Sequence, residues 1–266
     1  MTPRVVVFSG ETVFAAALGS GVLGSDASIP GIVISTRTTG SWKRVRSVAG
    51  KTFRGYFVYR ALVQVAGVGH RLLRRLTISS LARRRRLEPI RTAALGSDPR
   101  VLDLLPAELG VALNFDQIIP EAILRQFTHG VVNVHAGRLP EDKGISPALW
   151  AFARGDDEIW VSIYIMGAGI DTGQVVAQFP VAVMPGESFF TCYLRLCTEA
   201  GRRLPSVIAA IVAGSATPML ESTADQGAYH GWPDDQVRDG LRANQRRLLG
   251  LRGLIRLVVG LPRRPG

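Results

Sequence analysis

The sequence predicts an α/β fold in which an open, mostly parallel sheet carries helices on both faces. Patterns typical of strands and of helices alternate through the first half of the chain, as parallel sheets require. The apolar residues of segment 31–35 follow one another directly, which is typical of a strand buried on both faces. The chain has 266 residues, of which 47% are hydrophobic and 20% charged. This composition excludes disordered and fibrous proteins.

In the first half of the chain, each expected element follows from a local pattern. A strand is expected at 4–8, where a run of valines leads to a turn at Ser9-Gly10, and an alanine-rich helix at 13–18 follows. The second strand is 31–35, residues 101–105 are expected to be helical, and 110–114 is the third strand. A helix is expected over 120–127, because Glu121 in its first turn interacts favourably with the helix dipole.

In the second half, apolar and polar residues alternate over 131–135, which predicts a fourth strand followed by a loop at 136–144. A helix over 147–154 has proline at its first position. Segments 160–166 and 174–183 are expected strands, and 167–173 is a glycine-rich turn between them. A helix of about six or seven turns is expected over 188–212. In open sheets of this kind, ligands bind beyond the carboxyl ends of the strands.

Several classes of protein and of site are disfavoured. Cys192 and Cys197 are too few for a disulfide framework or a thiolate metal site, and they indicate a reducing compartment, so a cytoplasmic protein is expected. No run reaches about eighteen uncharged apolar residues, and the apolar start breaks at Ser9-Gly10, so neither a spanning helix nor a signal peptide is expected. A dinucleotide fingerprint of three glycines is missing after the first strand, which disfavours nicotinamide and flavin cofactors.

The net charge of +11 is concentrated in two segments. Residues 41–91 contain 14 Lys and Arg against one acid, and residues 238–266 contain 8 Arg against one acid. The remainder of the chain holds 10 basic against 19 acidic residues. This distribution predicts an acidic enzyme body with basic attachments, rather than a fold coated in nucleic acid.

Polar side chains gather where the expected strands end. Asn133 and His135 are two residues apart on one strand and therefore project from the same face. Asn114 and Asp116 follow the preceding strand, and Asp171 lies in the glycine-rich turn. An amide, an imidazole and a carboxylate in one crevice can polarise a carbonyl, stabilise an oxyanion and move a proton. The alternative is structural: these side chains would satisfy loop backbone and cap a turn.

These residues are part of a longer pattern. The chain reads Asn133-Val-His135-Ala-Gly-Arg-Leu-Pro140, then Gly144, Pro147, Trp150-Ala151, Gly169-Ile-Asp171-Thr-Gly and Gln178. Order, spacing and residue types over about 110–185 resemble the folate-dependent formyltransferases. This family includes the formyltransferases of methionyl-tRNA, glycinamide ribonucleotide and amino sugars. Weaker similarity reaches back to 5–10 and forward to Gln226, Tyr229 and Pro233.

The resemblance implies a Rossmann-like domain that transfers a formyl group from 10-formyltetrahydrofolate to an amine, without a metal. By motif match, Asn133, His135 and Asp171 are the expected catalytic residues. Asn133 and a protonated His135 would stabilise the formyl oxygen, and Asp171 would hold His135 and carry the amine proton. The resemblance implies that folate binds to two loops, whose expected contacts are Leu113, Asn114, Phe115, Asp116, Gly167, Gly169 and Ile170. Asn114 and Asp116 depart from the small or aliphatic residues of that family.

The acceptor site is less well specified by the sequence. Ser9, Gly10 and Thr12 occupy the turn where one branch of the family binds phosphate, and a helix N-terminus suits an anion, but Glu11 would repel it. The fifth strand reads Trp160-Val-Ser-Ile-Tyr164 where the family has Gly-x-Thr-x-His. Tyr164 is therefore expected either to line the acceptor site or to pack in the core.

The basic segments place apolar residues at helical spacing beside arginines. We therefore expect residues 1–220 to form the catalytic domain, with a basic helical insertion at 41–91, and 221–266 to form a basic helical extension. Three roles stay open for 41–91 and 238–266: packing on the body, peripheral contact with an anionic membrane, or contact with RNA.

Three functions follow from these expectations. The favoured one is formylation of a small primary amine, such as an amino-sugar nucleotide or a phosphorylated amine. One alternative is formylation of aminoacylated tRNA; the chain is too short to include the β-barrel domain of that branch, which counts against it. The other alternative is a non-catalytic module that binds a membrane or RNA. The sequence specifies neither the acceptor nor the oligomeric state.

Overall fold

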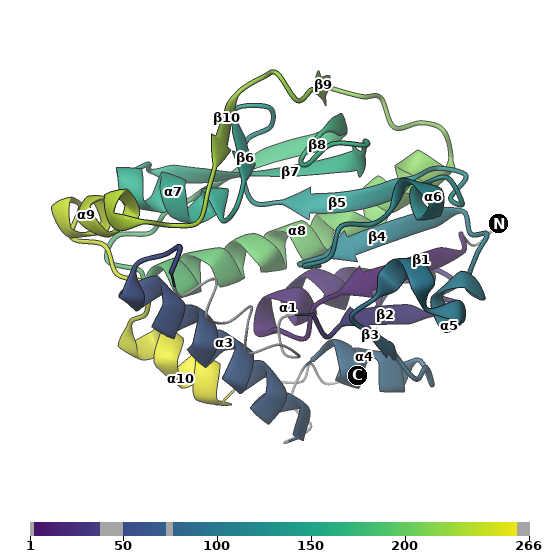
Figure 1. Cartoon of the computed structure of the whole chain (residues 1–266), viewed down its shortest axis with the longest axis horizontal. Coiled ribbons are helices and arrows are strands. Elements are labelled where there is room, and N and C mark those ends of the chain that lie inside the picture. The colour runs from purple at the N-terminus through teal and green to yellow at the C-terminus, as the bar shows by residue number, and fades with distance from the viewer. Residues whose placement is uncertain (1–2, 38–49, 73–76, 260–266) are drawn as a thin grey trace.

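The computed structural model describes residues 3–37, 50–72 and 77–259. Within these ranges, eight strands form one sheet in the order β3-β2-β1-β4-β5-β7-β8-β9 (Figure 1). They are β1 (Val5–Ser9), β2 (Ile32–Ser35), β3 (Ile90–Thr92), β4 (Leu109–Leu113), β5 (Val131–His135), β7 (Glu158–Met166), β8 (Gly173–Ala182) and β9 (Leu220–Ser222). Strands β1 to β5 pair in parallel, and β7, β8 and β9 are antiparallel to their neighbours. The predicted open, mostly parallel sheet is confirmed.

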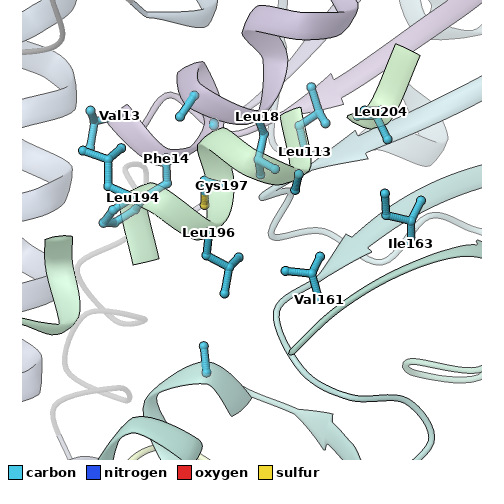
Figure 2. Packing of buried hydrophobic residues seen from close by; sticks show 14 of the residues in the cluster. Val13, Phe14, Leu18, Leu113, Val161, Ile163, Leu194, Leu196, Cys197 and Leu204 are labelled. Carbon is cyan, nitrogen blue, oxygen red and sulfur yellow. The ribbon is translucent and has the colours of Figure 1, made fainter. Parts of the chain in front are cut away.

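Helices cover both faces of the sheet, as predicted. They are α1 (Val13–Val22), α3 (Arg54–Leu72), α4 (Ile78–Arg84), η1 (Leu95–Ser97), α5 (Pro99–Leu102), α6 (Glu121–Leu124), α7 (Pro147–Arg154), α8 (Phe189–Val212), α9 (Asp235–Ala243) and α10 (Leu251–Val259). The larger apolar core lies between the sheet and α1, α4, α7 and α8; Figure 2 shows α1 and α8 meeting β4 and β7 there. The smaller core lies on the opposite face, under η1, α5 and α6.

Helix α1 continues four residues beyond the predicted 13–18, through two glycines that ordinarily weaken a helix. The reason is its close contact with α8. A side chain at Gly21 would come within 1.8 Å of the backbone oxygen of Gly201, and one at Gly201 within 2.5 Å of the oxygen of Ala17. Because both glycines lack side chains, the two helices pack backbone to backbone, and that tertiary contact outweighs the local propensity.

Other differences from the expected elements are at short segments. Helix α5 begins earlier than predicted, because Asp98 caps it and Pro99 occupies its first position. The expected helix over 120–127 is confined to α6. Strands β3 and β9, and a small parallel ribbon of β6 (Asp142–Gly144) and β10 (Ala228–His230), were not expected. Each is three residues long, too short for a recognisable hydrophobic period.

The basic insertion and the basic tail are helical where they are described. The insertion supplies α3 and α4, and the tail supplies α9 and α10; residues 41–49, 73–76 and 260–266 lie outside the described ranges. The segment after 220 contacts the rest of the described structure through several elements, and α10 packs against α3 and α8. Strand β9 pairs with β8, β10 pairs with β6, and α9 packs on α7. The division at 220 stays a prediction.

Candidate active site

The carboxyl ends of β1, β4 and β5 meet at one edge of the sheet and open into a cavity of about 590 Å³. This volume is typical of a small-molecule site. Asn133 and His135 project into it from β5, and Asp171 reaches it from the loop between β7 and β8. The other lining residues include Thr12, Phe14, Arg37, Lys51, Tyr56, Tyr59, Arg60, Asn114, Phe115, Asp116, Gly144, Ser146, Tyr193 and Trp232. The structure thus brings together the amide, imidazole and carboxylate predicted from the sequence.

His135 is buried between two oxygen acceptors. Its Nε2 lies 2.6 Å from the backbone oxygen of Asp142, and its Nδ1 lies 3.4 Å from Asp171 Oδ1. Because a carbonyl oxygen can only accept, Nε2 carries a proton and donates it. The ring is thereby fixed in orientation, with its second nitrogen facing the carboxylate. The side chains of His135 and Asp171 are only 6% and 11% exposed, so water screens this contact weakly.

Tyr164 connects the other two members of the cluster. It lies directly opposite Asn133 in the pairing of β5 with β7. Asn133 Nδ2 donates to the Tyr164 hydroxyl at 3.0 Å, and this hydroxyl donates to Asp171 Oδ1 at 3.1 Å. Burial, together with the neighbouring Asp171 carboxylate, raises the pKa of Tyr164, so the phenol keeps its proton and remains a donor. Tyr164 is buried behind the cavity and is not among its lining residues.

The backbone around Asp171 is held in a strained position. Asp171 has φ +52°, in the left-handed region, and its backbone oxygen accepts from Ser222 Oγ at 2.9 Å. Its second carboxylate oxygen accepts from the backbone N–H of Gly144 at 2.7 Å. Gly144 has φ +101°, and a side chain there would come within 2.2 Å of the backbone oxygen of His230. Only glycine at position 144 therefore allows β6 to lie so close to β10.

The ribbon of β6 and β10 fixes the loop that carries these contacts. The carboxylate of Asp142 binds His230 Nε2 at 2.8 Å and Arg154 at 3.4 Å. The buried Lys143 donates to the backbone oxygens of Thr223 and Ala224 at 2.9 and 3.0 Å. No local sequence pattern predicts this clamp, because it joins segments about eighty residues apart in the chain.

Helix α3 forms the wall of the cavity that faces the cluster. Tyr56 donates to or accepts from Ser146 Oγ at 2.5 Å, and the Arg60 guanidinium lies 5.2 Å from the ring centre of Trp232. The Tyr59 hydroxyl is buried with no hydrogen-bond partner among the described residues, and burial raises its pKa. Arg37 and Lys51 complete this wall. The basic insertion therefore contributes cations and aromatic rings to the cavity.

The other sequence-predicted residues divide into those at the cavity and those away from it. The cavity is lined by Thr12, Asn114, Phe115 and Asp116. Leu113 is buried in the core, and the cavity is not lined by Gly167, Gly169 or Ile170. Thr12 also caps α1. Ser9 is fully buried and donates to the Leu113 backbone oxygen, and Gly10 packs against the backbone of Asn114.

Glu11 does not face the cavity as a free negative charge. Its carboxylate accepts from the Ser79 hydroxyl at 2.6 Å and binds Arg91 at 2.8 Å. The repulsion of an anion expected from the sequence is therefore offset by this ion pair. Among the described residues, no cluster of three or more His, Cys, Asp or Glu could hold a metal ion.

Comparison with known proteins agrees with this geometry. Residues 79–208 match the model of the formyl transferase family. This segment belongs to that family. It contains the whole cluster of Asn133, His135, Tyr164 and Asp171, so the site described above lies in the formyl transferase region.

The formyl transferase region has both sequence relatives and structural neighbours. The methionyl-tRNA formyltransferase of Myxococcus xanthus is 37% identical over 109 residues, which are 41% of this chain and 35% of that protein. That of Roseobacter denitrificans is 34% identical over 152 residues, 56% of this chain and 50% of that protein. The chain thus matches half or less of each relative's length.

Solved structures share the fold at low identity. WlaRD, a sugar 3N-formyl transferase determined with dTDP and 5-N-formyl-THF, superposes with a TM-score of 0.57 at 17% identity over 87% of this chain and 70% of that one. Glycinamide ribonucleotide transformylase 1 of Symbiobacterium toebii gives 0.55 at 17% identity over 80% and 89%. The Rossmann-like formyltransferase fold predicted from the sequence is confirmed.

Proposed function

We propose that the chain transfers a formyl group from 10-formyltetrahydrofolate to the primary amine of a small acceptor. The observation that carries the proposal is the meeting of Asn133, His135 and Asp171 at one cavity, within a segment of the formyl transferase family. An amide donor, an imidazole and a carboxylate are the groups that amine acylation needs. They stabilise charge on the carbonyl oxygen and remove a proton from the amine.

The residues present fit a folate donor. The cavity has the volume of a small-molecule site, and the loop after β4 lines it with Asn114, Phe115 and Asp116. These three residues would hold the pterin end, whereas Gly167, Gly169 and Ile170 do not line the cavity and are left out of the proposed folate contacts. When bound, 10-formyltetrahydrofolate supplies an activated formyl carbon. The chain's own contribution is to orient the reactants, exclude water and move protons.

Each member of the cluster has a role that follows from its contacts. One amide hydrogen of Asn133 goes to Tyr164, and the other is available for the formyl oxygen. Both ring nitrogens of His135 face protein oxygens, so its Nε2–H would turn from the backbone oxygen of Asp142 to the formyl oxygen when the reactants bind; losing one such donor typically costs about 2.7–4 kcal/mol of barrier. Asp171 would accept the proton that leaves the amine, directly or through water. Holding the amine beside the formyl carbon lowers the entropic part of the barrier.

The α3 wall supports an acceptor that carries phosphate. Arg37, Lys51 and Arg60 line the cavity together with Tyr56 and Trp232. Cations bind phosphate oxygens, and aromatic rings stack on a flat base or a sugar face. We therefore favour an amino-sugar nucleotide or a phosphorylated amine, and a similar fold was solved with dTDP.

A second candidate acceptor is aminoacylated tRNA. The sequence relatives are named methionyl-tRNA formyltransferases, and the basic insertion reaches the cavity through α3. A tRNA substrate would engage these charges through its phosphate backbone, so its binding would weaken steeply with salt.

The test is release of tetrahydrofolate from 10-formyltetrahydrofolate in the presence of candidate amines. We expect release with a phosphate-bearing small amine, and loss of release in His135→Gln. Asp239→Asn on α9, which does not line the cavity, is the control and should retain the wild-type rate. Release only with aminoacylated tRNA would support the second candidate, and no release with any amine would contradict formyl transfer.

A further inference from the structure

Helices α3 and α10 expose apolar side chains on their outer faces. Of the fourteen large apolar side chains that are exposed in the described part of the chain, eight lie on these two helices. They are Val58, Leu62, Val65, Leu251, Leu254, Ile255, Val258 and Val259. The two helices are in contact and lie next to each other at the surface (Figure 1). A concentration of exposed apolar residues of this kind marks an interaction site rather than an ordinary surface.

Each of the two helices has a second apolar stripe besides the one that packs on the protein. On α3, Tyr56, Tyr59 and Val63 are buried, whereas Val58, Leu62 and Val65 recur at intervals of four and three residues on the outer side. On α10, Gly253 and Leu257 are buried, and the exposed residues repeat the same spacing. If these helices only packed on the protein body, their solvent faces would be formed by arginines. Instead, the solvent faces of both helices are largely apolar.

The charges on these two helices are all positive. Residues 54–72 and 251–259 contain no Asp or Glu, and Arg54, Arg252 and Arg256 are exposed. This combination selects among partners. Two copies that met through this same face would bring arginine against arginine, and RNA phosphates would leave the apolar side chains in water. An anionic bilayer surface satisfies both, since apolar residues enter the acyl boundary and arginines meet the headgroups.

We propose that the outer faces of α3 and α10 dock on an anionic phospholipid surface. The helices lie in the plane of the interface; in the described part of the chain no helix is long and apolar enough to cross a bilayer. The proposal is independent of formyl transfer, although α3 links the two. Its inner face lines the cavity through Tyr56, Tyr59 and Arg60, so docking places that wall of the cavity at the membrane.

The test is co-sedimentation of the full chain with phosphatidylcholine vesicles, alone or with phosphatidylglycerol. We expect binding to the anionic vesicles, weak binding to the neutral ones, and a fall with added salt. The combined substitution Val65→Ser, Leu251→Ser and Val258→Ser should reduce binding about tenfold or more. These three side chains are 70%, 74% and 66% exposed, so the variant keeps its core. Met184→Ser with Met219→Ser, at 52% and 60% exposure elsewhere, is the matched control and should bind as wild type.

Three outcomes would overturn the proposal. The first is absence of sedimentation with anionic vesicles, and the second is unchanged binding by the triple variant. The third is a dimer in analytical ultracentrifugation that the triple variant dissociates, without vesicle binding, which would assign the surface to a second copy. Circular dichroism and the thermal midpoint of each variant verify that folding is unchanged. Formyl-transfer activity does not enter these readouts, so failure here leaves the proposed function untouched.

Discussion

The hydroxyl of Tyr164 donates to Asp171 Oδ1 at 3.1 Å and accepts from Asn133 at 3.0 Å. A residue that does not line the cavity thus joins two that do. Its position follows from strand register, because Tyr164 is paired with Asn133 across β5 and β7. We infer that Tyr164 acts through these partners, as a positioning residue in the proposed reaction.

Tyr164→Phe should therefore lower kcat more than it changes KM. The ring remains packed against Leu139 and Val175, but Asn133 and Asp171 lose their shared partner. We expect kcat to fall about tenfold to a hundredfold, with about 1.4 kcal/mol of barrier per factor of ten. Steady-state kinetics of tetrahydrofolate release measures this. Tyr229→Phe, at an exposed tyrosine, is the control, and wild-type kcat in Tyr164→Phe would contradict the positioning role.

Gly144→Ala should damage both the loop and the site. A methyl group would collide with the His230 backbone oxygen, and the left-handed backbone disfavours alanine. We expect the free energy of unfolding to fall by about 1–3 kcal/mol, together with a lower kcat, since the Gly144 N–H that binds Asp171 shifts. Urea denaturation and kinetics test this. Gly231→Ala, which has open space, should be neutral, and equal behaviour of the two variants would refute the explanation.

Gly21→Ala tests the contact of α1 with α8. Alanine is ordinarily the better helix former, but here its side chain would meet the Gly201 oxygen. Destabilisation by about 1–3 kcal/mol or more is expected from overpacking, measured by guanidinium denaturation. Gly69→Ala on α3, where no atom of the described residues lies within 4 Å of the added methyl group, should be neutral or stabilising. A stabilised Gly21→Ala variant would show that the helices can move apart without cost.

Stability should decline in alkaline solution. Burial raises the pKa of Tyr59, Tyr164 and Tyr193, and raises the pKa of Cys192 to about 12. The unfolded chain loses these protons near ordinary pKa values while the folded chain keeps them. The unfolded state therefore binds fewer protons, and the free energy of unfolding falls as pH rises above about 9–10.

The thermal midpoint followed between about pH 8 and pH 11 measures this decline. Tyr193→Phe should make the decline shallower, because it removes one buried ionisable group. Tyr229→Phe, whose side chain is exposed, should leave it unchanged. A midpoint independent of pH over this range would contradict the burial argument.

The sequence predicted those parts of the site that depend on local pattern. Asn133 and His135 share a face because strands have a period of two, and Asp171 lies in a glycine-rich turn. The bridging role of Tyr164 was beyond prediction, because it depends on the register of an antiparallel pair. The clamp of Asp142 with His230 joins residues 88 apart, and short strands such as β6 give no periodic signal.

The fold was predictable to a similar extent. The buried strands and α7 and α8 carry strong hydrophobic periods, so their positions agree closely with the structure. The extension of α1 through Gly19 and Gly21 could not be predicted, because it depends on α8 lying against it. The role of α3 as a cavity wall likewise comes only from tertiary packing.

The most direct test of the central claim is the rate of tetrahydrofolate release by Asp171→Asn. The substitution keeps size and shape but removes the charge that faces His135 and accepts from Tyr164 and Gly144. We predict a fall of about a hundredfold or more in a variant that folds normally by circular dichroism. Release at the wild-type rate would contradict a catalytic role for the cluster of Asn133, His135 and Asp171.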